Sequence, residues 1–181
     1  TVNNNRNEIV FVDKNLTDWQ LVVNDIRPGI EIVTIDSNLN GLDEIANYLN
    51  GKNHIDDIHI FMQSNKDIIR LGNLEIFSDE LNAFTTDLGV INNALSSQGH
   101  VYFYGMTDQN ANQLFVNNVA ALSKFDVLDS SQLNNIDWTL GTLPSGVETN
   151  TPLLDSILNQ NSYDLFLKTG IEVLQRGDSS R

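Results

Sequence analysis

Two hydrophobic periods divide the chain into short apolar runs and longer segments with helical spacing. The apolar, β-branched runs predict parallel central strands at residues 9–12, 30–35, 58–61 and 101–104. The helical spacing predicts helices at residues 17–26, 42–49, 79–95 and 109–122. A repeated strand–helix–strand succession favours parallel pairing with right-handed crossovers. We therefore expect an α/β fold, a three-layer, doubly wound and mostly parallel sheet flanked by helices.

Smaller features follow the third and fourth strands. Residues 67–77 alternate around Gly72-Asn73, which predicts a small hairpin after the third strand. Weaker strand patterns occupy residues 125–128, 138–140 and 146–148, and a helical pattern covers 152–174. The expected organisation is an α/β domain over residues 1–150 and a C-terminal helical extension or linker over 151–181, which packs on the same domain or leads away from it.

The charge balance changes what the fold can be expected to bind. Among 181 residues, 24 are acidic and 10 are basic, a formal net charge of −14 that repels nucleic acid and anionic lipid. No apolar run reaches the roughly 20 residues that cross a bilayer. We expect no nucleic-acid binding and no membrane insertion. A protein or peptide partner stays open, and the pattern indicates no oligomeric state.

The absence of cysteine and the spacing of the histidines limit the kinds of reaction and metal site that the chain can have. Without cysteine there is no disulfide, thiolate metal site or thiol nucleophile. His54, His59 and His100 show no helical i, i+4 spacing, and the chain has no phosphate-binding glycine loop or Gly-x-Ser-x-Gly elbow. The sequence therefore predicts no metal site and no cofactor.

One acidic loop partly matches a calcium-binding pattern. It begins at Asp36 with oxygen-bearing residues at alternate positions, but its twelfth position is Asn47 rather than the bidentate Glu that calcium needs. A strand-to-helix turn capped by Asn40 explains the segment better. Asp13 ends the first strand as Asp36 ends the second, so both are expected at the carboxyl edge, where open α/β sheets bind ligands. Ordinary loop capping by the two acids is the alternative.

Several segments in one order carry a family resemblance: residues 8–13, 29–33, 40–46, 58–60, 71–72 and 104–105. Together they resemble a bacterial domain of unknown function from the N-terminal part of giant secreted or surface-attached, adhesin-like proteins. That family is similar in fold to caspase-like cysteine peptidases, in which a His follows the third strand and a Cys follows the fourth. The resemblance implies a caspase-like fold, an extracellular or cell-surface location, and a place within a larger polypeptide.

The resemblance also implies a substituted peptidase site. Gln63 and Met106 stand at the His and Cys positions, and neither side chain can act as the base or the thiolate. We therefore expect no catalytic residue, no enzymatic activity, and vestigial active-site positions at Gln63 and Met106. The remaining candidates, expected to form a binding edge, are Asp13, Asp36, Met62, Ser64 and Gly105.

Three functions are left open by the sequence. The preferred interpretation is a non-catalytic, caspase-like domain that serves as a structural or protein-recognition module of a large exported, adhesin-like protein. The first alternative is a hydrolase with displaced residues, Ser64 as the nucleophile and His59 or His100 as its base. The second is a calcium-dependent adhesion module acting through the acidic loops, which calcium would stabilise against unfolding.

Overall fold

A computed structural model provides the structure of the chain. It describes residues 7–17, 19–24, 26, 29–65, 68–104, 117–122, 126–127 and 171–176. The elements, in chain order, are β1 (Glu8–Asp13), α1 (Trp19–Asn24), β2 (Glu31–Ile35), α2 (Gly41–Leu49), β3 (Ile55–Phe61), β4 (Gln63–Asn65), β5 (Ile68–Leu71), β6 (Leu74–Phe77), the 3-10 helix η1 (Ser78–Phe84), α3 (Thr85–Ala94), β7 (Leu95–Tyr104), β8 (Asp126–Val127) and β9 (Ile171–Gln175).

The main sheet is mixed and mostly parallel. Its strand order is β2-β1-β3-β7-β9-β8, and β1, β2, β3 and β7 pair in parallel. The prediction of four parallel strands is therefore confirmed. One detail was wrong: residues 30–35 were expected to form a central strand, yet β2 is an edge strand of the described sheet, with Glu31 and Ile32 exposed. β9 is antiparallel to both β7 and β8.

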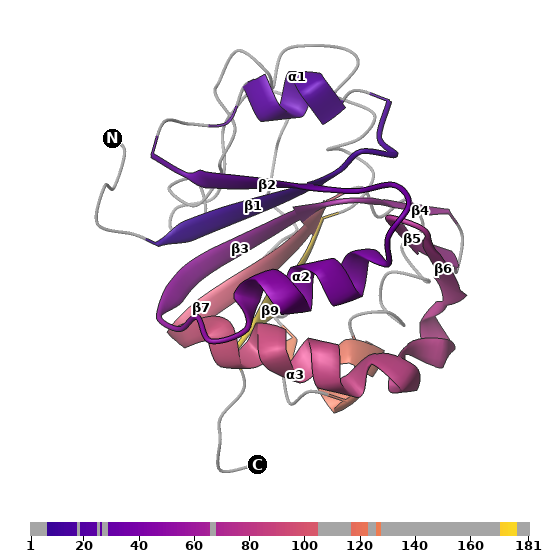
Figure 1. The fold of residues 1–181 in the computed structure, drawn as a ribbon. Coiled ribbons are helices and arrows are strands. Elements are labelled where there is room, and N and C mark those ends of the chain that lie inside the picture. Colours follow the sequence, from indigo (N-terminus) through magenta and orange to yellow (C-terminus); the bar gives the residue numbers. More distant parts are fainter. Residues whose placement is uncertain are drawn as a thin grey trace.

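Helices flank both faces of this sheet (Figure 1), α1 on one side and α2 and α3 on the other. The α2–α3 side holds the main apolar cluster, because alternate residues of the strands point to it. Its buried members include Ile9, Phe11, Ile58, Ile60, Val101 and Phe103 from the sheet and Leu42, Ile45, Leu49, Leu88 and Ile91 from the two helices. The expected α/β sheet flanked by helices is thus confirmed.

A second, three-stranded antiparallel sheet, β4-β5-β6, follows β3 directly. Strands β5 and β6 form the predicted hairpin, with Leu71 paired to Leu74 across Gly72-Asn73. Gly72 has a φ of +63°, a conformation that residues with a side chain rarely adopt. Strand β4, over Gln63–Asn65, was not predicted from the sequence.

The segment after β6 differs from the single helix expected over residues 79–95. A 3-10 turn precedes a shorter α3, and β7 begins at Leu95, so Gly99 lies inside the strand rather than ending a helix. Here β7 approaches β3 closely: a Cβ on Gly99 would lie 2.9 Å from the Ile55 carbonyl oxygen. A glycine is needed by the sheet at this position, where the strand register also shifts.

The helical pattern expected over residues 152–174 is wrong for its last four residues, which lie in strand β9. The helical pattern over residues 152–174 ends inside β9, whose Leu174 is buried and pairs with Val101 of β7. The end of the expected extension therefore belongs to the main sheet. Residues 117–122 are helical, as expected. The strand patterns at 138–140 and 146–148 lie outside the described residues. No described helix has the length and apolar character to span a bilayer.

Candidate functional site

Asp13 lies at the carboxyl end of β1, fully buried. Its two carboxylate oxygens accept hydrogen bonds from the backbone amides of Asn15 (2.9 Å) and Gly72 (3.1 Å), and the Asn15 side chain donates to the Gly72 carbonyl. Burial raises the pKa of the Asp13 carboxyl, and these backbone hydrogen bonds act in the opposite direction. Asp13 thus fastens the β5–β6 hairpin to the carboxyl edge of the main sheet.

Asp36 follows β2 at the same edge and organises its own loop. Its carboxylate accepts the Asn38 amide at 2.8 Å, and its backbone amide donates to Glu44 of α2 at 2.9 Å. Burial raises the pKa of Glu44, and the negative charges of Asp36 and Asp13 add to that shift. As expected, Asp13 and Asp36 both lie at the carboxyl edge of the main sheet. Asn40 caps α2 through the amides of Leu42 and Asp43, as the turn interpretation predicted.

The remaining residues of the predicted edge are divided between core and surface. Met62 is buried in the main apolar cluster, and its amide donates to the Tyr104 carbonyl. Gln63 is exposed at the start of β4, opposite Arg70, and Ser64 pairs with Ile69 in the same small sheet. Gly105 and Met106 lie outside the described residues, so the expected cleft between Gln63 and Met106 stays a prediction.

The histidines offered as bases for Ser64 lie in the main sheet rather than beside β4. His59 is fully buried in β3, and its Nδ1 lies 2.9 Å from the Tyr104 hydroxyl. His100 is half-buried in β7, beside Asp57. His54 is exposed in the loop before β3, with a positive φ. Among the described contacts, both strand histidines are engaged with residues of their own sheet.

Sequence reasoning missed a polar grid on the α1 face of the sheet. Parallel register places three rows of side chains side by side across β1, β3 and β7. The first row is Glu8, Asp57 and His100; the second is Val10, His59 and Tyr102; the third is Val12, Phe61 and Tyr104. We name these nine residues the polar grid.

The ionisable residues of the polar grid lie close together, and three of them, Glu8, Asp57 and His59, are buried. His59 Nε2 lies 4.0 Å from Glu8 Oε1, and His100 Nδ1 lies 3.9 Å from Asp57 Oδ1. Glu8, Asp57 and His59 each bring a possible ligand atom, and these three atoms lie within 4.8 Å of one another. Carboxylates and an imidazole at such distances can exchange protons or hold a cation.

Aromatic rings fix the orientation of the grid's central imidazole. The His59 ring stacks on Tyr102, with centroids 4.9 Å apart and planes at 13°. Phe61 stacks in the same way on Tyr104, at 4.3 Å and 4°. A signal for this arrangement was present in the sequence: Asp57 and His59 alternate along a predicted strand, which puts both on one face.

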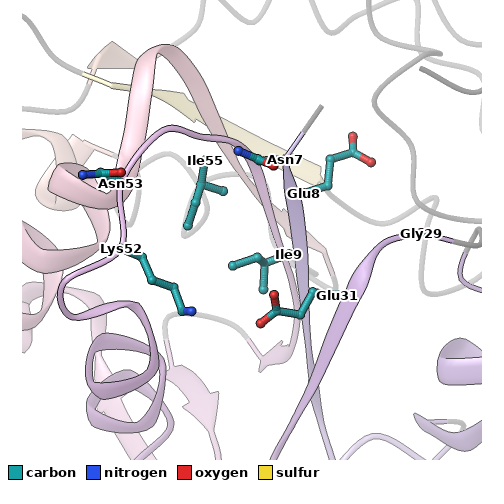
Figure 2. A pocket seen from close by; sticks show the side chains of 8 residues that line it. All are labelled: Asn7, Glu8, Ile9, Gly29, Glu31, Lys52, Asn53 and Ile55. Atoms are coloured by element: carbon teal, nitrogen blue, oxygen red, sulfur yellow. The ribbon is translucent and has the colours of Figure 1, made fainter. Parts of the chain in front are cut away.

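A pocket of about 390 Å³ opens at the opposite, amino edge of the sheet. Figure 2 shows Lys52 and Glu31 pointing toward one another across it, and Ile9 and Ile55 also line it. Glu8 also lines this pocket, although its carboxylate points away from Lys52 and Glu31 (Figure 2). Strand β1 thus separates the pocket from the polar grid.

With this geometry established, comparison places the chain in a family. Residues 9–166 match the family described as Domain of unknown function (DUF4347), and the chain belongs to that family. The description assigns no activity. No curated protein sequence matches the chain at a significant level.

Solved structures with some likeness to the chain are methyltransferases. One is the release factor-specific protein-(glutamine-N5) methyltransferase of Alicyclobacillus acidocaldarius, at 11% identity, TM-score 0.39, and 95% and 81% coverage of this chain and that chain. Another belongs to the complex of the Haloferax volcanii Trm112 methyltransferase activator, at 9% identity, TM-score 0.36, and 95% and 83% coverage. A third is an antibiotic-related methyltransferase, at 11% identity and a TM-score of 0.33, with 95% of this chain and 88% of that chain covered.

This finding overturns the prediction that the chain is not an enzyme, because the similar structures are those of enzymes. The prediction rested on Gln63 and Met106, and the substitution of those two positions removes only thiol-peptidase chemistry. With TM-scores of 0.33 to 0.39, the likeness supplies neither a reaction nor a cofactor for this chain.

Proposed function

We propose that this chain is a protein-recognition domain of a larger exported, adhesin-like polypeptide. In this proposal, the domain is built on a caspase-like sheet and binds an extended, basic segment of its partner along β4. The observation that carries the proposal is the small sheet β4-β5-β6, fastened to the carboxyl edge by Asp13. The exported location and the larger polypeptide rest on the family resemblance of the sequence.

The strand order supports a ligand edge at this place. The order β2-β1-β3-β7 puts the point where the winding reverses between β1 and β3. Ligands of open α/β sheets bind outside the carboxyl ends of the strands at such a point. Asp13 ends β1 and accepts a hydrogen bond from Gly72 of the β5–β6 turn, and Gln63, just after β3, begins β4 of the small sheet. Doubly wound sheets in general share this order, and the caspase-like part of the proposal rests on the family resemblance of the sequence.

The position of β4 favours binding by strand addition. β4 is an outer strand of its sheet, and no described strand pairs with its second side. An extended peptide can add to such an edge through main-chain hydrogen bonds, with side-chain contacts providing selectivity. The net charge of −14 favours a partner rich in Lys and Arg, and so do the carboxylates of Asp36 and Glu44, whose loop contacts the Gly72-Asn73 turn of the small sheet.

A pair of matched surface variants tests the proposal. Gln63→Trp adds bulk at the exposed start of β4, and Asn93→Trp adds the same bulk to an exposed site on α3. Binding of extended ten-residue peptides, basic or acidic, is measured by fluorescence polarisation. We expect basic peptides to bind and Gln63→Trp to weaken them at least tenfold, while Asn93→Trp leaves affinity unchanged. Equal affinity for the acidic peptides, or equal loss in both variants, would refute the proposal.

A further inference from the structure

We propose that Glu8, Asp57 and His59 bind one divalent transition-metal ion of the Zn²⁺ type on the α1 face of the main sheet. This site is independent of the recognition edge, because it lies toward the amino ends of β1 and β3, whereas the recognition edge lies at their carboxyl ends. It makes use of buried side chains to which the recognition proposal gives no role.

The fold itself assembles the three ligands. Asp57 and His59 are two residues apart in β3, so their side chains emerge on the same face. Parallel register sets Glu8 of β1 directly opposite Asp57. A site on strands of a packed sheet is held more rigidly than one on loops. The three side chains lie almost wholly inside the protein, with Glu8 at 8% exposure and the other two at 0%.

The distances fit a site that tightens around its ion. Zinc bonds to imidazole nitrogen and carboxylate oxygen are about 2.0–2.2 Å long, which puts tetrahedral ligand atoms roughly 3.3–3.6 Å apart. The Nε2 of His59 and Oε1 of Glu8 are 4.0 Å apart, and all three ligand atoms lie within 4.8 Å. Small rotations of the Glu8 and Asp57 side chains would close that difference.

The ring of His59 is already oriented for coordination. Its Nδ1 faces the Tyr104 hydroxyl at 2.9 Å, while its Nε2 faces Glu8. A hydrogen bond from Nδ1–H to the hydroxyl oxygen leaves the lone pair on Nε2, the atom that would bind metal. Metal-binding histidines commonly have their second nitrogen held in this way. Stacking on Tyr102 fixes the plane of the ring.

The donor set selects the kind of ion. An imidazole suits zinc and its first-row neighbours, and carboxylates complete such sites in many proteins. Calcium takes six to eight oxygen ligands, and magnesium keeps several waters, neither of which suits a buried site with one nitrogen donor. The ion would therefore be bound while the chain folds or opens locally, since metal binding and folding are coupled.

The test uses the full chain and loads it in two ways. After chelator treatment, Zn²⁺ is offered either to the folded protein or during refolding, and bound zinc is counted by elemental analysis and native mass spectrometry. We expect one zinc per wild-type chain after refolding and an unfolding midpoint raised by several degrees. Asp57→Asn and His59→Gln lose both effects, whereas Asp56→Asn, the same Asp-to-Asn change at the preceding residue, keeps them.

Two further readouts keep the proposal open to refutation where a buried variant fails to fold. Tyr104→Phe removes only the hydroxyl that orients His59, and we expect it to weaken zinc affinity by roughly 10- to 100-fold with the stoichiometry unchanged. Co²⁺ loaded in place of zinc should give a visible absorption band in the wild type and in the exposed-histidine control His54→Gln.

Three results would overturn the site. The first is no zinc on the wild-type chain after refolding with Zn²⁺. The second is zinc retained by a folded Asp57→Asn chain, which would indicate surface binding. The third is affinity unchanged by Tyr104→Phe. Peptide binding at β4 is measured separately with metal-free protein, so failure of one proposal leaves the other distinguishable.

Discussion

Replacing Gly72 by alanine tests how the small sheet is joined to the carboxyl edge. Gly72 has a φ of +63°, which costs an alanine about 1 kcal/mol. Its Cβ would also lie 2.1 Å from the Leu39 carbonyl oxygen, against an ordinary contact of about 3.5 Å. The hairpin would have to shift, straining the bonds from Gly72 to Asp13 and from Asn73 to Leu39. We expect a total loss of about 3–5 kcal/mol.

Gly51→Ala is the matched control for this change. Gly51 also has a positive φ, +83°, but nothing lies within 4 Å of the position its Cβ would occupy. The control should therefore lose only about 1 kcal/mol. Urea unfolding of both variants, followed by circular dichroism, measures the difference in the free energy of unfolding. A Gly72→Ala variant as stable as Gly51→Ala would show that the hairpin does not approach the Leu39 backbone as closely as described.

Three smaller predictions concern the helices and the acidic loop. Burial and the neighbouring Asp43 raise the pKa of Asp87 from 3.8 to about 6. The folded state therefore binds this proton more tightly than the unfolded state, and the stability that the proton contributes is lost as the pH rises between those values. Asp87→Asn should lessen the decline in the urea midpoint from pH 4 to 7, and an unchanged profile would contradict this. Asn40→Ala removes the cap of α2 and should cost about 1 kcal/mol in urea unfolding, whereas no loss would rule out a capping role. Millimolar calcium should leave the thermal midpoint nearly unchanged, because Asp36 caps its own loop and Asn47 stands where a bidentate acid is needed; a shift of several degrees abolished by Asp36→Ala would restore the adhesion hypothesis.

The parallel strands could be predicted because their apolar runs are continuous, as a strand covered on both faces requires. β1 is buried at every position. β9 was missed because its five residues, from Ile171 to Gln175, also continue a helical pattern, and so short a segment does not separate a period of 2 from one of 3.6. Its pairing with β7 depends on tertiary contacts that local pattern does not contain.

The two candidate sites differ in how far the sequence reveals them. Asp13 and Asp36 end apolar runs, so their place at the carboxyl edge follows from parallel topology alone. The polar grid depends on register, which sets Glu8 opposite Asp57 and His59 opposite Tyr102. Alternation within β3 could have put Asp57 and His59 on one face. It could not have supplied the partners from β1 and β7, which lie next to β3 only in the folded sheet.

Recognition along β4 is tested most directly by following backbone amide signals of the full-length, isotope-labelled chain during titration with a basic, extended ten-residue peptide. We expect saturable shifts centred on Gln63–Asn65 of β4 and reaching β5, with no response to the acidic peptide of equal length. Shifts centred instead on Lys52 and Asn53 of the amino-edge pocket, or no saturable shift at all, would contradict it.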